Sequence, residues 1–222
     1  MNHEWKKIKL LADADDSVLK SIDERGWPVS YAEGEPVLWE GDECQAVYFI
    51  TSGMVEVYRT AIDGRAHTLR VLRAGDSFNL APALMKEEKN LANARCLVTT
   101  DILVLGCEDL QIIIARHPDF AVRILQEMAE RLADMTRLTS ELALLTVRER
   151  TAVFLMREAE NILINAGRRW TQDDMARQIG TVRDVIGRTL RDFEEKGLIL
   201  RDRGNISLVN REGLERTADG CE

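Results

Sequence analysis

The hydrophobic pattern of this chain changes its period at Pro118. Before that proline, apolar runs rich in β-branched and aromatic residues are separated by glycines, as strands are. These runs are 47–50, 55–58, 69–72 and 102–105. After it, apolar residues recur at intervals of three and four, the spacing of an amphipathic helix. We therefore predict an α+β protein in which a sheet domain precedes the helices.

The first part of the chain is predicted to be an antiparallel sandwich or roll. Its glycines, at positions 34, 41, 53, 64 and 75, are spaced as turns between short strands are. Asp63-Gly64 is a two-residue hairpin signal. Ahead of the strands, Val18, Leu19 and Ile22 predict a short helix over 16–25. We assign residues 1–117 to this domain.

A long helix is predicted over residues 118–146, and it carries a heptad stripe: Ala121, Leu125, Met128, Leu132, Met135, Thr139, Leu142 and Thr146. A second line of Ile124, Leu138 and Leu145 widens the apolar face. The alternative is a helix that packs only on the sheet of its own chain. Such a helix requires a broad apolar face but no heptad stripe. A helix that covers the roll and also pairs with its copy explains both lines. We therefore expect a homodimer, with an interface made of Leu125, Met128, Leu132, Met135 and Leu142.

Residues 147–222 are predicted to form a winged helix-turn-helix. A helix from Arg148 is expected to stop at Ala166-Gly167, and Thr171 is the N-cap candidate of the next helix, with Asp174 three residues later. After a break at Gly180-Thr181, a second helix runs from Val182 to Lys196 and is closed by Gly197. Gly204-Asn205 then turns a small hairpin.

The second of these helices is the candidate recognition helix. Its spacing assigns one face to the core: Val182, Val185, Ile186, Thr189, Leu190 and Phe193. The opposite face is Arg183, Asp184, Gly187, Arg188 and Arg191. Guanidinium groups can bind guanine and a carboxylate can accept from cytosine, and a mid-helix glycine suggests close approach of a sugar-phosphate strand. Thr171 and Gln172 are placed to hold a phosphate with backbone N–H groups. The alternative is a solvated face with internal ion pairs.

Composition excludes several other classes of protein. The net charge is −8, yet the residues from Val147 onward hold fourteen basic and fourteen acidic side chains, so the candidate DNA-binding end is neutral. Apolar runs are too short to span a membrane, and no secretory signal opens the chain, so we expect a cytoplasmic protein. The four cysteines form no Cys-x-x-Cys pair, and the strand-rich segment 34–107 holds one histidine, His67. We expect no metal site and no enzymatic activity.

Several motifs resemble the CRP/FNR family of transcription regulators. The segment 180–190, followed by Glu194 and 197–199, is similar to the recognition helix of that family. The likeness continues through the long helix at 127–132, Leu142, Leu145 and Arg150, and through the roll at 40–42, 48–50, Gly53, 75–76 and Phe78. It implies a cyclic-nucleotide-binding-like jelly roll, base contacts from Arg183, Asp184 and Arg188, and a phosphate contact at Thr171. The implied partners are double-stranded DNA, RNA polymerase and a second copy of the chain.

The resemblance also implies an effector pocket in the roll. Family members that bind cyclic nucleotides carry a Gly-Glu pair and an Arg-Ser or Arg-Thr pair, where this chain has Asn79-Leu80 and Asn90-Leu91. Met135 and Thr136 stand at the positions on the long helix that reach the base. A buried phosphate without a cation is costly, so we do not expect cyclic AMP to bind. Arg95 is an alternative source of the missing charge.

Other signals remain open. An iron–sulfur cluster would need N-terminal cysteines, and residues 1–29 contain none. We expect no cofactor, with haem as an alternative whose candidate ligands are Cys44, Cys96, Cys107, His3, His67, His117 and the methionines. The effector is unknown, and the candidates are an apolar ligand, a redox signal at the thiols, or none. A different functional class is a nucleotide- or small-ligand-binding module that regulates a protein partner, which the arginines of the recognition face disfavour.

Overall fold

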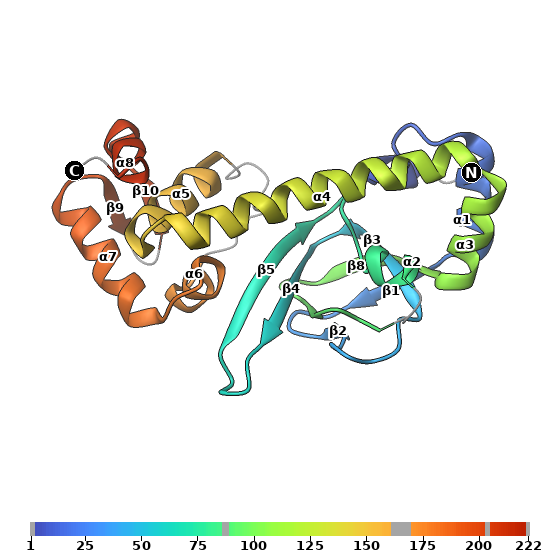
Figure 1. Ribbon diagram of the computed structural model, residues 1–222, viewed down its shortest axis with the longest axis horizontal. Helices are drawn as coiled ribbons and strands as arrows, with labels where there is room; N and C mark the ends of the chain where they lie inside the picture. Colours follow the sequence, from blue (N-terminus) through green and yellow to red (C-terminus); the bar gives the residue numbers. More distant parts are fainter. Residues whose placement is uncertain (1–2, 86–88, 161–169, 203–204, 221–222) are drawn as a thin grey trace. The chain divides into compact units, whose positions relative to one another are not determined.

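The computed structural model describes residues 3–85, 89–160, 170–202 and 205–220 (Figure 1). The chain divides into two compact units, residues 1–133 and residues 134–222. The boundary falls inside one continuous helix, α4 (Pro118–Leu144). The predicted α+β class, with a strand-rich first part and a helical second part, is confirmed.

Over its described ranges, the first unit contains two short 3-10 helices, eight strands and three helices besides the start of α4. In chain order they are η1 (His3–Lys7), η2 (Lys9–Leu11), α1 (Asp16–Arg25), β1 (Trp27–Tyr31), β2 (Pro36–Leu38), β3 (Ala46–Ser52), β4 (Met54–Thr60), β5 (Ala66–Arg73), β6 (Ser77–Phe78), α2 (Leu80–Leu84), β7 (Asn93–Cys96), β8 (Thr100–Gly106) and α3 (Cys107–Arg116).

Two antiparallel four-stranded sheets form the roll, with strand orders β1-β8-β3-β6 and β2-β7-β4-β5. Side chains of a strand alternate between its two faces, and β3 and β8 are apolar on both. Ile50 and Val104 point into the core between the sheets. Phe49 and Leu105 point to the other side, into a core shared with the helices. This two-sided burial explains why the sequence at 47–50 and 102–105 is continuously apolar.

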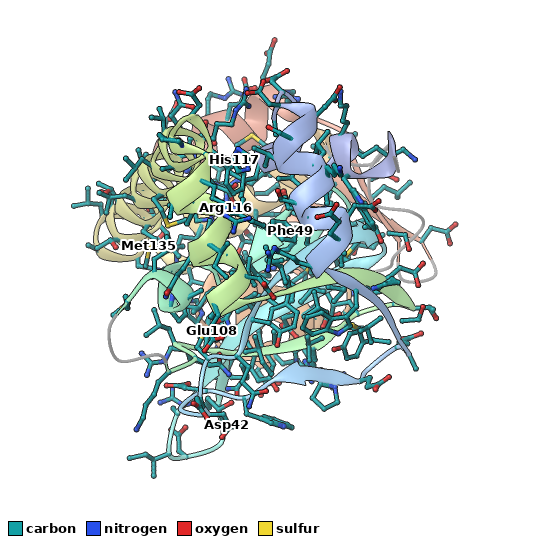
Figure 2. All side chains as sticks on the ribbon, turned by 90° about the vertical axis from the view of Figure 1, so that its right-hand side faces the viewer. Asp42, Phe49, Glu108, Arg116, His117 and Met135 are labelled. Atoms are coloured by element: carbon teal, nitrogen blue, oxygen red, sulfur yellow. The ribbon has the colours of Figure 1, made fainter. Side chains whose placement is uncertain are left out.

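A layer of helices covers the outer face of the β1-β8-β3-β6 sheet. Phe49, labelled in Figure 2, is fully buried there together with apolar residues from η2, α1, α2, α3 and the start of α4. Helices α1 and α3 lie side by side (Figure 1), joined by an ion pair of 2.6 Å between Arg25 Nη1 and Asp109 Oδ1. The predicted helix over 16–25 is confirmed, and its apolar residues are buried.

The turn between β4 and β5 differs in detail from the prediction. The hairpin is present, but its loop has three residues, Ile62, Asp63 and Gly64, because the Ala61 N–H donates to the Arg65 carbonyl at 2.8 Å. Gly64 has φ +84°, and its N–H donates to the Ala61 carbonyl. A turn followed by a left-handed glycine is the usual three-residue hairpin. A two-residue loop is therefore wrong here, although the glycine was the right signal.

Helix α4 begins at Pro118, where the sequence predicts it to begin. Phe120 and Ile124 are buried in the core of the first unit, and Met128 packs against the same core while remaining partly exposed. In contrast, Leu125 and Leu132 are 67% and 68% exposed. The helix ends at Leu144, two residues short of the predicted 146, because Thr146 caps the next helix. Its hydroxyl accepts from the Glu149 N–H, and Glu149 Oε2 accepts from the Thr146 N–H at 2.6 Å.

In its described residues, the second unit holds the end of α4, a three-helix bundle, a two-stranded wing and a final helix. Its elements are α5 (Val147–Glu160), α6 (Gln172–Ile179), α7 (Arg183–Glu195), β9 (Ile199–Asp202), β10 (Asn205–Leu208) and α8 (Arg211–Ala218). Ile186, Leu190 and Phe193 of α7 are almost completely buried. Helix α8 was not predicted, and it places the fully buried Leu214 in the same core. The predicted winged helix-turn-helix is confirmed.

One core assignment is wrong. Val182 is 49% exposed, because it is the extended N-cap residue of α7 (φ −109°, ψ 154°) and not part of the helix. The predicted helix end at Ala166-Gly167 lies outside the described residues, as does Gly204 of the wing turn. Among the described helices, none is long and apolar enough to cross a membrane.

Candidate nucleic-acid interface and sensor site

The turn between α6 and α7 is fixed by local interactions that the sequence encodes. Thr171 Oγ1 accepts from the Asp174 N–H, and Asp174 Oδ2 accepts from the Thr171 N–H, both at 3.1 Å, so the predicted N-cap is a complete capping box. At the other end of α6, Gly180 has φ +74°. The N–H groups of Gly180 and Thr181 both donate to the Ala176 carbonyl. This left-handed cap directs the chain sharply into α7.

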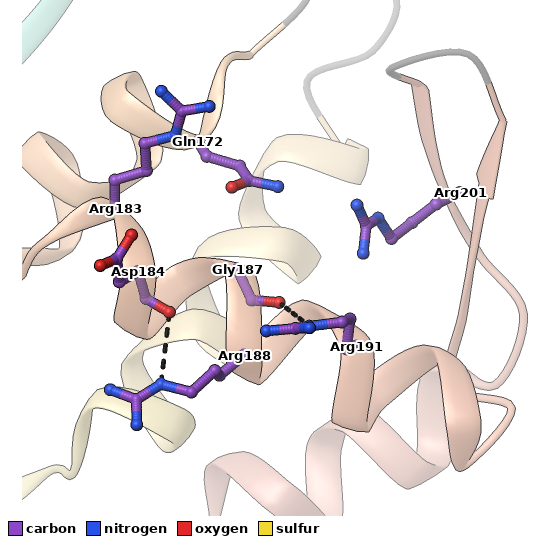
Figure 3. A pocket seen from close by; sticks show the side chains of 7 residues that line it. All are labelled: Gln172, Arg183, Asp184, Gly187, Arg188, Arg191 and Arg201. Carbon is purple, nitrogen blue, oxygen red and sulfur yellow. Dashed lines mark hydrogen bonds between the residues drawn. The ribbon is translucent and has the colours of Figure 1, made fainter.

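The exposed face of α7 borders a pocket of about 680 Å³ in the second unit (Figure 3). It brings together six of the predicted DNA-contact residues and one further arginine, as follows: Gln172, Arg183, Asp184, Gly187, Arg188, Arg191 and Arg201. Four guanidinium groups against one carboxylate make this surface cationic, although residues 147–222 taken together are neutral. The seventh predicted residue, Thr171, does not line the pocket, and its hydroxyl is engaged in the capping box.

The arginines of α7 are held loosely and remain available to a partner. Arg188 Nε donates to the Asp184 carbonyl at 3.4 Å, and Arg191 Nε donates to the Gly187 carbonyl at 3.2 Å (Figure 3). In the part of the chain that the structure describes, neither has a carboxylate partner. Arg183 Nη1 lies 3.5 Å from Asp173 Oδ2, a pair that is more than half exposed on both sides. Exposed pairs of this kind contribute little to stability, so a phosphate or a base can replace them.

Gly187 has a neighbour within the protein. A Cβ at this position would lie 3.2 Å from Oε1 of Gln172, the first residue of α6. The sequence suggested an approaching nucleic-acid strand as the reason for this glycine. The structure gives an internal reason as well, since the glycine lets the Gln172 side chain lie against α7 at the edge of the pocket.

Arg201 of the wing is the residue of this surface that the sequence analysis missed. Its side chain extends from β9 toward the pocket (Figure 3). Glu194 of α7 holds the strand in place, since its Oε1 accepts from the Arg201 N–H at 3.1 Å and its Oε2 lies 3.7 Å from Arg201 Nη1. The sequence did contain a signal for this residue, because a basic side chain just before a predicted wing turn is a candidate DNA contact.

Asn79, Leu80, Asn90 and Leu91 are the candidate effector residues that lie in the first unit. Asn79 and Asn90 meet directly, with 2.9 Å between Asn79 Nδ2 and Asn90 Oδ1. Leu80 is fully buried in the core beneath the helices, whereas Leu91 is 50% exposed. Met135 and Thr136 belong to the second unit and are exposed on α4. Among these four residues of the first unit, the two asparagines are the ones that bind each other.

Asn79 and Asn90 bind each other and the backbone around them. Asn79 Nδ2 also donates to the Ala46 carbonyl at 3.0 Å, and Asn90 Nδ2 donates to the Trp39 carbonyl at 3.1 Å. Asn79 is the one described non-glycine residue with positive φ, at +63°, and it is the N-cap of α2. Asparagine tolerates this conformation better than most residues. These contacts tie the segment before α2 to the segment before β7.

Arg95, the alternative phosphate ligand, is engaged in an ion pair. Its Nε and Nη2 lie 2.8 and 2.7 Å from Oε2 of Glu56, whose side chain is 4% exposed. Thr68 Oγ1 donates to the other carboxylate oxygen at 2.5 Å. The guanidinium carbon lies 5.0 Å from the centre of the Tyr58 ring. Removing Arg95 from this arrangement would take a paired cation away from a buried carboxylate, which is costly.

The residues named for haem are dispersed, apart from one pair. Cys96 is buried in the core between the sheets, and His67 lies on β5. The thiols of Cys44 and Cys107 lie close to each other. His117 follows α3, and the His3 side chain and Cys221 lie outside what is described. Within the described ranges, no three His, Cys, Asp or Glu side chains gather as a metal site would require.

A network of hydrogen bonds attaches α4 to the roll inside the first unit. Arg131 Nη2 donates to the Ser77 carbonyl at 2.7 Å and to Ser77 Oγ at 2.8 Å. Ser77 Oγ donates to Glu127 Oε1 at 2.7 Å, and Glu127 forms an ion pair with Arg131. Ser77 lies two residues before Asn79. The asparagine pair and the long helix are therefore connected through one short segment.

Two family models match this chain. The cyclic nucleotide-binding domain matches residues 28–117, and the Crp-like helix-turn-helix domain matches residues 149–217. Among curated proteins, the chain is 28% identical over 193 residues to the cyclic AMP receptor protein of Thermus thermophilus, covering 86% of this chain and 87% of that protein. It is 24% identical over 210 residues to a CRP-like cAMP-activated global transcriptional regulator of Mycobacterium tuberculosis, covering 92% and 93%.

Solved structures show the same fold. A CRP/FNR family protein from Eubacterium rectale superposes with a TM-score of 0.79 at 24% identity, covering 96% of this chain and 99% of that one. The c-di-GMP responsive global regulator CLP of Xanthomonas campestris superposes with a TM-score of 0.76 at 20% identity, covering 87% and 99%. The relatives matched over most of this chain are transcription regulators, not enzymes. The two family models occur here in the order that the resemblance implied, and the chain belongs to the CRP/FNR family of DNA-binding transcription regulators.

Proposed function

We propose that this regulator acts as a homodimer that binds a palindromic DNA site through α7, under the control of a signal other than cyclic AMP. The observation that carries the proposal is the cationic pocket on α7, where Arg183, Arg188 and Arg191 project from one helix face beside Gln172. The N-terminal residues of a recognition helix contact base edges in the major groove. Arg183 and Asp184 are the first two residues of α7, so they are the first candidates for readout.

Each pocket residue has a role that follows from its chemistry. Arg183 and Arg188 present guanidinium forks for guanine O6 and N7, and Asp184 presents an acceptor for cytosine N4. Gln172 is the first residue of α6, where backbone N–H groups point outward and a phosphate is stabilised. Arg191 lies a turn further along α7 and Arg201 lies on the wing, so we assign both to the DNA backbone, which sets position but carries no sequence information.

The exposed apolar residues of α4 support the homodimer. Leu125, Leu132 and Met135 are 67%, 68% and 63% exposed, and Leu142 is 39% exposed. Their successive intervals of seven, three and seven residues follow the heptad seam of a coiled coil, which a second α4 would cover. Two recognition helices in one dimer would then read half-sites about one helical turn, roughly 34 Å, apart.

Cyclic AMP does not fit the residues of the sensor roll. The asparagine side chains bind each other, Leu80 and Leu91 point to different environments, and the nearby Arg95 neutralises the buried Glu56. We therefore assign control to another ligand or to a redox signal. The segment from Ser77 to Asn79 would pass that signal to Glu127 and Arg131 on α4. Because the proposed target is DNA, we also propose that the protein acts in the cytoplasm and that RNA polymerase is its protein partner.

In vitro selection from random DNA with the purified full chain tests this function. We expect enrichment of an inverted repeat whose half-site centres lie about 10 base pairs apart. Footprinting on the selected site should protect both half-sites on one face of the duplex. The same selection with cyclic AMP added should enrich the same sequence to the same degree. Binding to all duplexes alike, with no sequence enriched, would overturn the assignment of α7 as a reader of bases.

A further inference from the structure

Two thiols from distant parts of the sequence meet at one corner of the roll. Cys44 lies two residues before β3, and Cys107 is the first residue of α3, directly after β8. Strands β3 and β8 pair with Ala46 opposite Gly106, and the Cys107 N–H continues the ladder by donating to the Gln45 carbonyl at 3.0 Å. The two sulfurs lie 3.6 Å apart. The pairing of two long strands thus fixes the backbones that carry these thiols.

The geometry fits closure to a disulfide. A disulfide has its sulfurs about 2.05 Å apart, so the two Sγ atoms need to approach by about 1.5 Å. Rotation about χ1 between staggered rotamers moves a cysteine Sγ over a distance of this order, and we infer that it supplies the approach here. Cys107 Sγ already points at the segment it would join, because it donates to the Cys44 carbonyl at 3.3 Å.

The two thiols differ in their access to solvent. Cys44 is 3% exposed, whereas Cys107 is partly exposed. An oxidant in solution therefore reaches Cys107 first, and Cys44 is the neighbour placed to react with it. Cys96 provides a contrast inside the same domain. It is completely buried in the core between the sheets, and burial raises the pKa of its thiol, which disfavours the reactive thiolate.

We propose that Cys44 and Cys107 form a redox-active pair that closes to an intramolecular disulfide when the protein meets a hydroperoxide. The Cys107 thiolate attacks the peroxide, the O–O bond breaks, and an alcohol leaves while Cys107 becomes a sulfenic acid. The Cys44 thiolate then attacks the Cys107 sulfur, the S–S bond forms, and hydroxide leaves as water. In total, two thiols lose two protons and two electrons, and the hydroperoxide is reduced to an alcohol and water.

The pair contacts the asparagine bridge of the sensor roll. Asn79 Nδ2 donates to Cys44 Sγ at 3.3 Å as well as to Asn90 Oδ1. Closure of the disulfide moves Cys44 Sγ toward Cys107 and so changes one of the hydrogen bonds that hold Asn79. Asn79 caps α2, and Ser77, two residues earlier, binds Glu127 of α4. Oxidation of the pair therefore acts at the point where the roll connects to the long helix.

Thiol counting on the full chain tests the pair. All proteins carry Cys221→Ser, so that three cysteines remain. The reduced protein, denatured and treated with N-ethylmaleimide, should gain three adducts. After one equivalent of cumene hydroperoxide it should gain a single adduct, on Cys96, and tryptic peptides containing Cys44 and Cys107 should be joined. Dithiothreitol should restore three adducts. Three adducts after oxidation, a bridge that includes Cys96, or sulfinic acid on Cys107 without a bridge would overturn the proposal.

Matched variants separate the pair from general thiol chemistry. Cys44→Ser and Cys107→Ser should each abolish the bridge, whereas Cys96→Ser should retain it. If either serine variant fails to fold, the peptide map of the parent protein still decides the question. A second readout follows from the contact with Asn79, whose side-chain NH₂ signals in the NMR spectrum should shift on oxidation and return on reduction. Unchanged signals in a protein that has formed the bridge would contradict the link to the asparagine pair.

Discussion

The side-chain amide of Asn79 donates a hydrogen bond to the side-chain carbonyl of Asn90, with 2.9 Å between Nδ2 and Oδ1. At the corresponding positions, the family members that bind cyclic nucleotides carry a glycine and an arginine. Two uncharged amides here bind each other, and each also binds a backbone carbonyl. The hydrogen bonds of this partly buried pair are thus made within the protein.

Cyclic AMP should therefore fail to bind. Calorimetry with the nucleotide at millimolar concentration should give no saturable heat, because a buried phosphate would lack a cation. The Arg95→Met variant is the control for the alternative source of charge. If the parent protein bound with a micromolar dissociation constant and Arg95→Met abolished that binding, Arg95 would be the phosphate ligand and our assignment of this segment would be wrong.

Readout by α7 predicts two kinds of DNA defect. Arg183→Ala and Arg188→Ala should each weaken binding to the selected site by about 1–3 kcal/mol and weaken binding to random DNA much less, since each removes a contact to a base edge. Arg201→Ala should weaken both kinds of binding alike, because we assign it to the DNA backbone. Competition titrations at fixed salt measure the affinity of each variant for the selected site and for random DNA. Equal losses on both DNAs for Arg188→Ala would make it a backbone contact instead.

Gly187→Ala should separate stability from DNA binding. Alanine favours a helix interior by about 1 kcal/mol over glycine, and the atom it would approach, Gln172 Oε1 at 3.2 Å, is the end of a flexible side chain. We expect chemical denaturation to show an unchanged or slightly higher free energy of unfolding, while DNA affinity falls as Gln172 is displaced. A loss of stability with unchanged DNA affinity would show that this glycine serves only the packing of α6 on α7. The double variant with Gln172→Ala is the control for that contact.

Thr171 is predicted to act chiefly through its cap. Thr171→Ala should lower the free energy of unfolding by about 1 kcal/mol, because the Asp174 N–H loses its acceptor. Thr171→Ser keeps the hydroxyl and should retain both stability and DNA affinity. Thermal denaturation and DNA titration of the two variants provide the comparison. Full stability in Thr171→Ala, together with weaker DNA binding, would favour a direct phosphate contact by the hydroxyl.

The dimer depends on the exposed apolar line of α4. Replacing Leu132 and Leu142 together with aspartate should give monomers, because charged residues would stand at the seam of the coiled coil. Sedimentation velocity measures the oligomeric state, and footprinting should show that the paired half-sites are no longer protected. Val122→Asp changes an apolar residue that is 52% exposed but lies outside the heptad line, so it should leave the dimer intact. A tight dimer after the double change would refute this interface.

The sequence alone determined the features that depend on short-range order. The change of hydrophobic period at Pro118 located the start of α4, because a helix and a strand repeat at different intervals. Thr171 with Asp174, and Gly180 between α6 and α7, were identifiable because caps are made by residues a few positions apart. The same helical period correctly grouped Arg183, Asp184, Gly187, Arg188 and Arg191 on one face.

Only the tertiary structure decided which distant residues meet. The pairs Asn79–Asn90, Glu56–Arg95 and Cys44–Cys107 depend on the register of strands and loops that are far apart in the sequence. Register is set by packing of the whole roll, which no local pattern encodes. The same holds for Arg201, which reaches the pocket because the wing folds back beside α7. Periodicity assigns a residue to one face of its helix or strand. Which residues of other segments contact that face is determined by how the core packs.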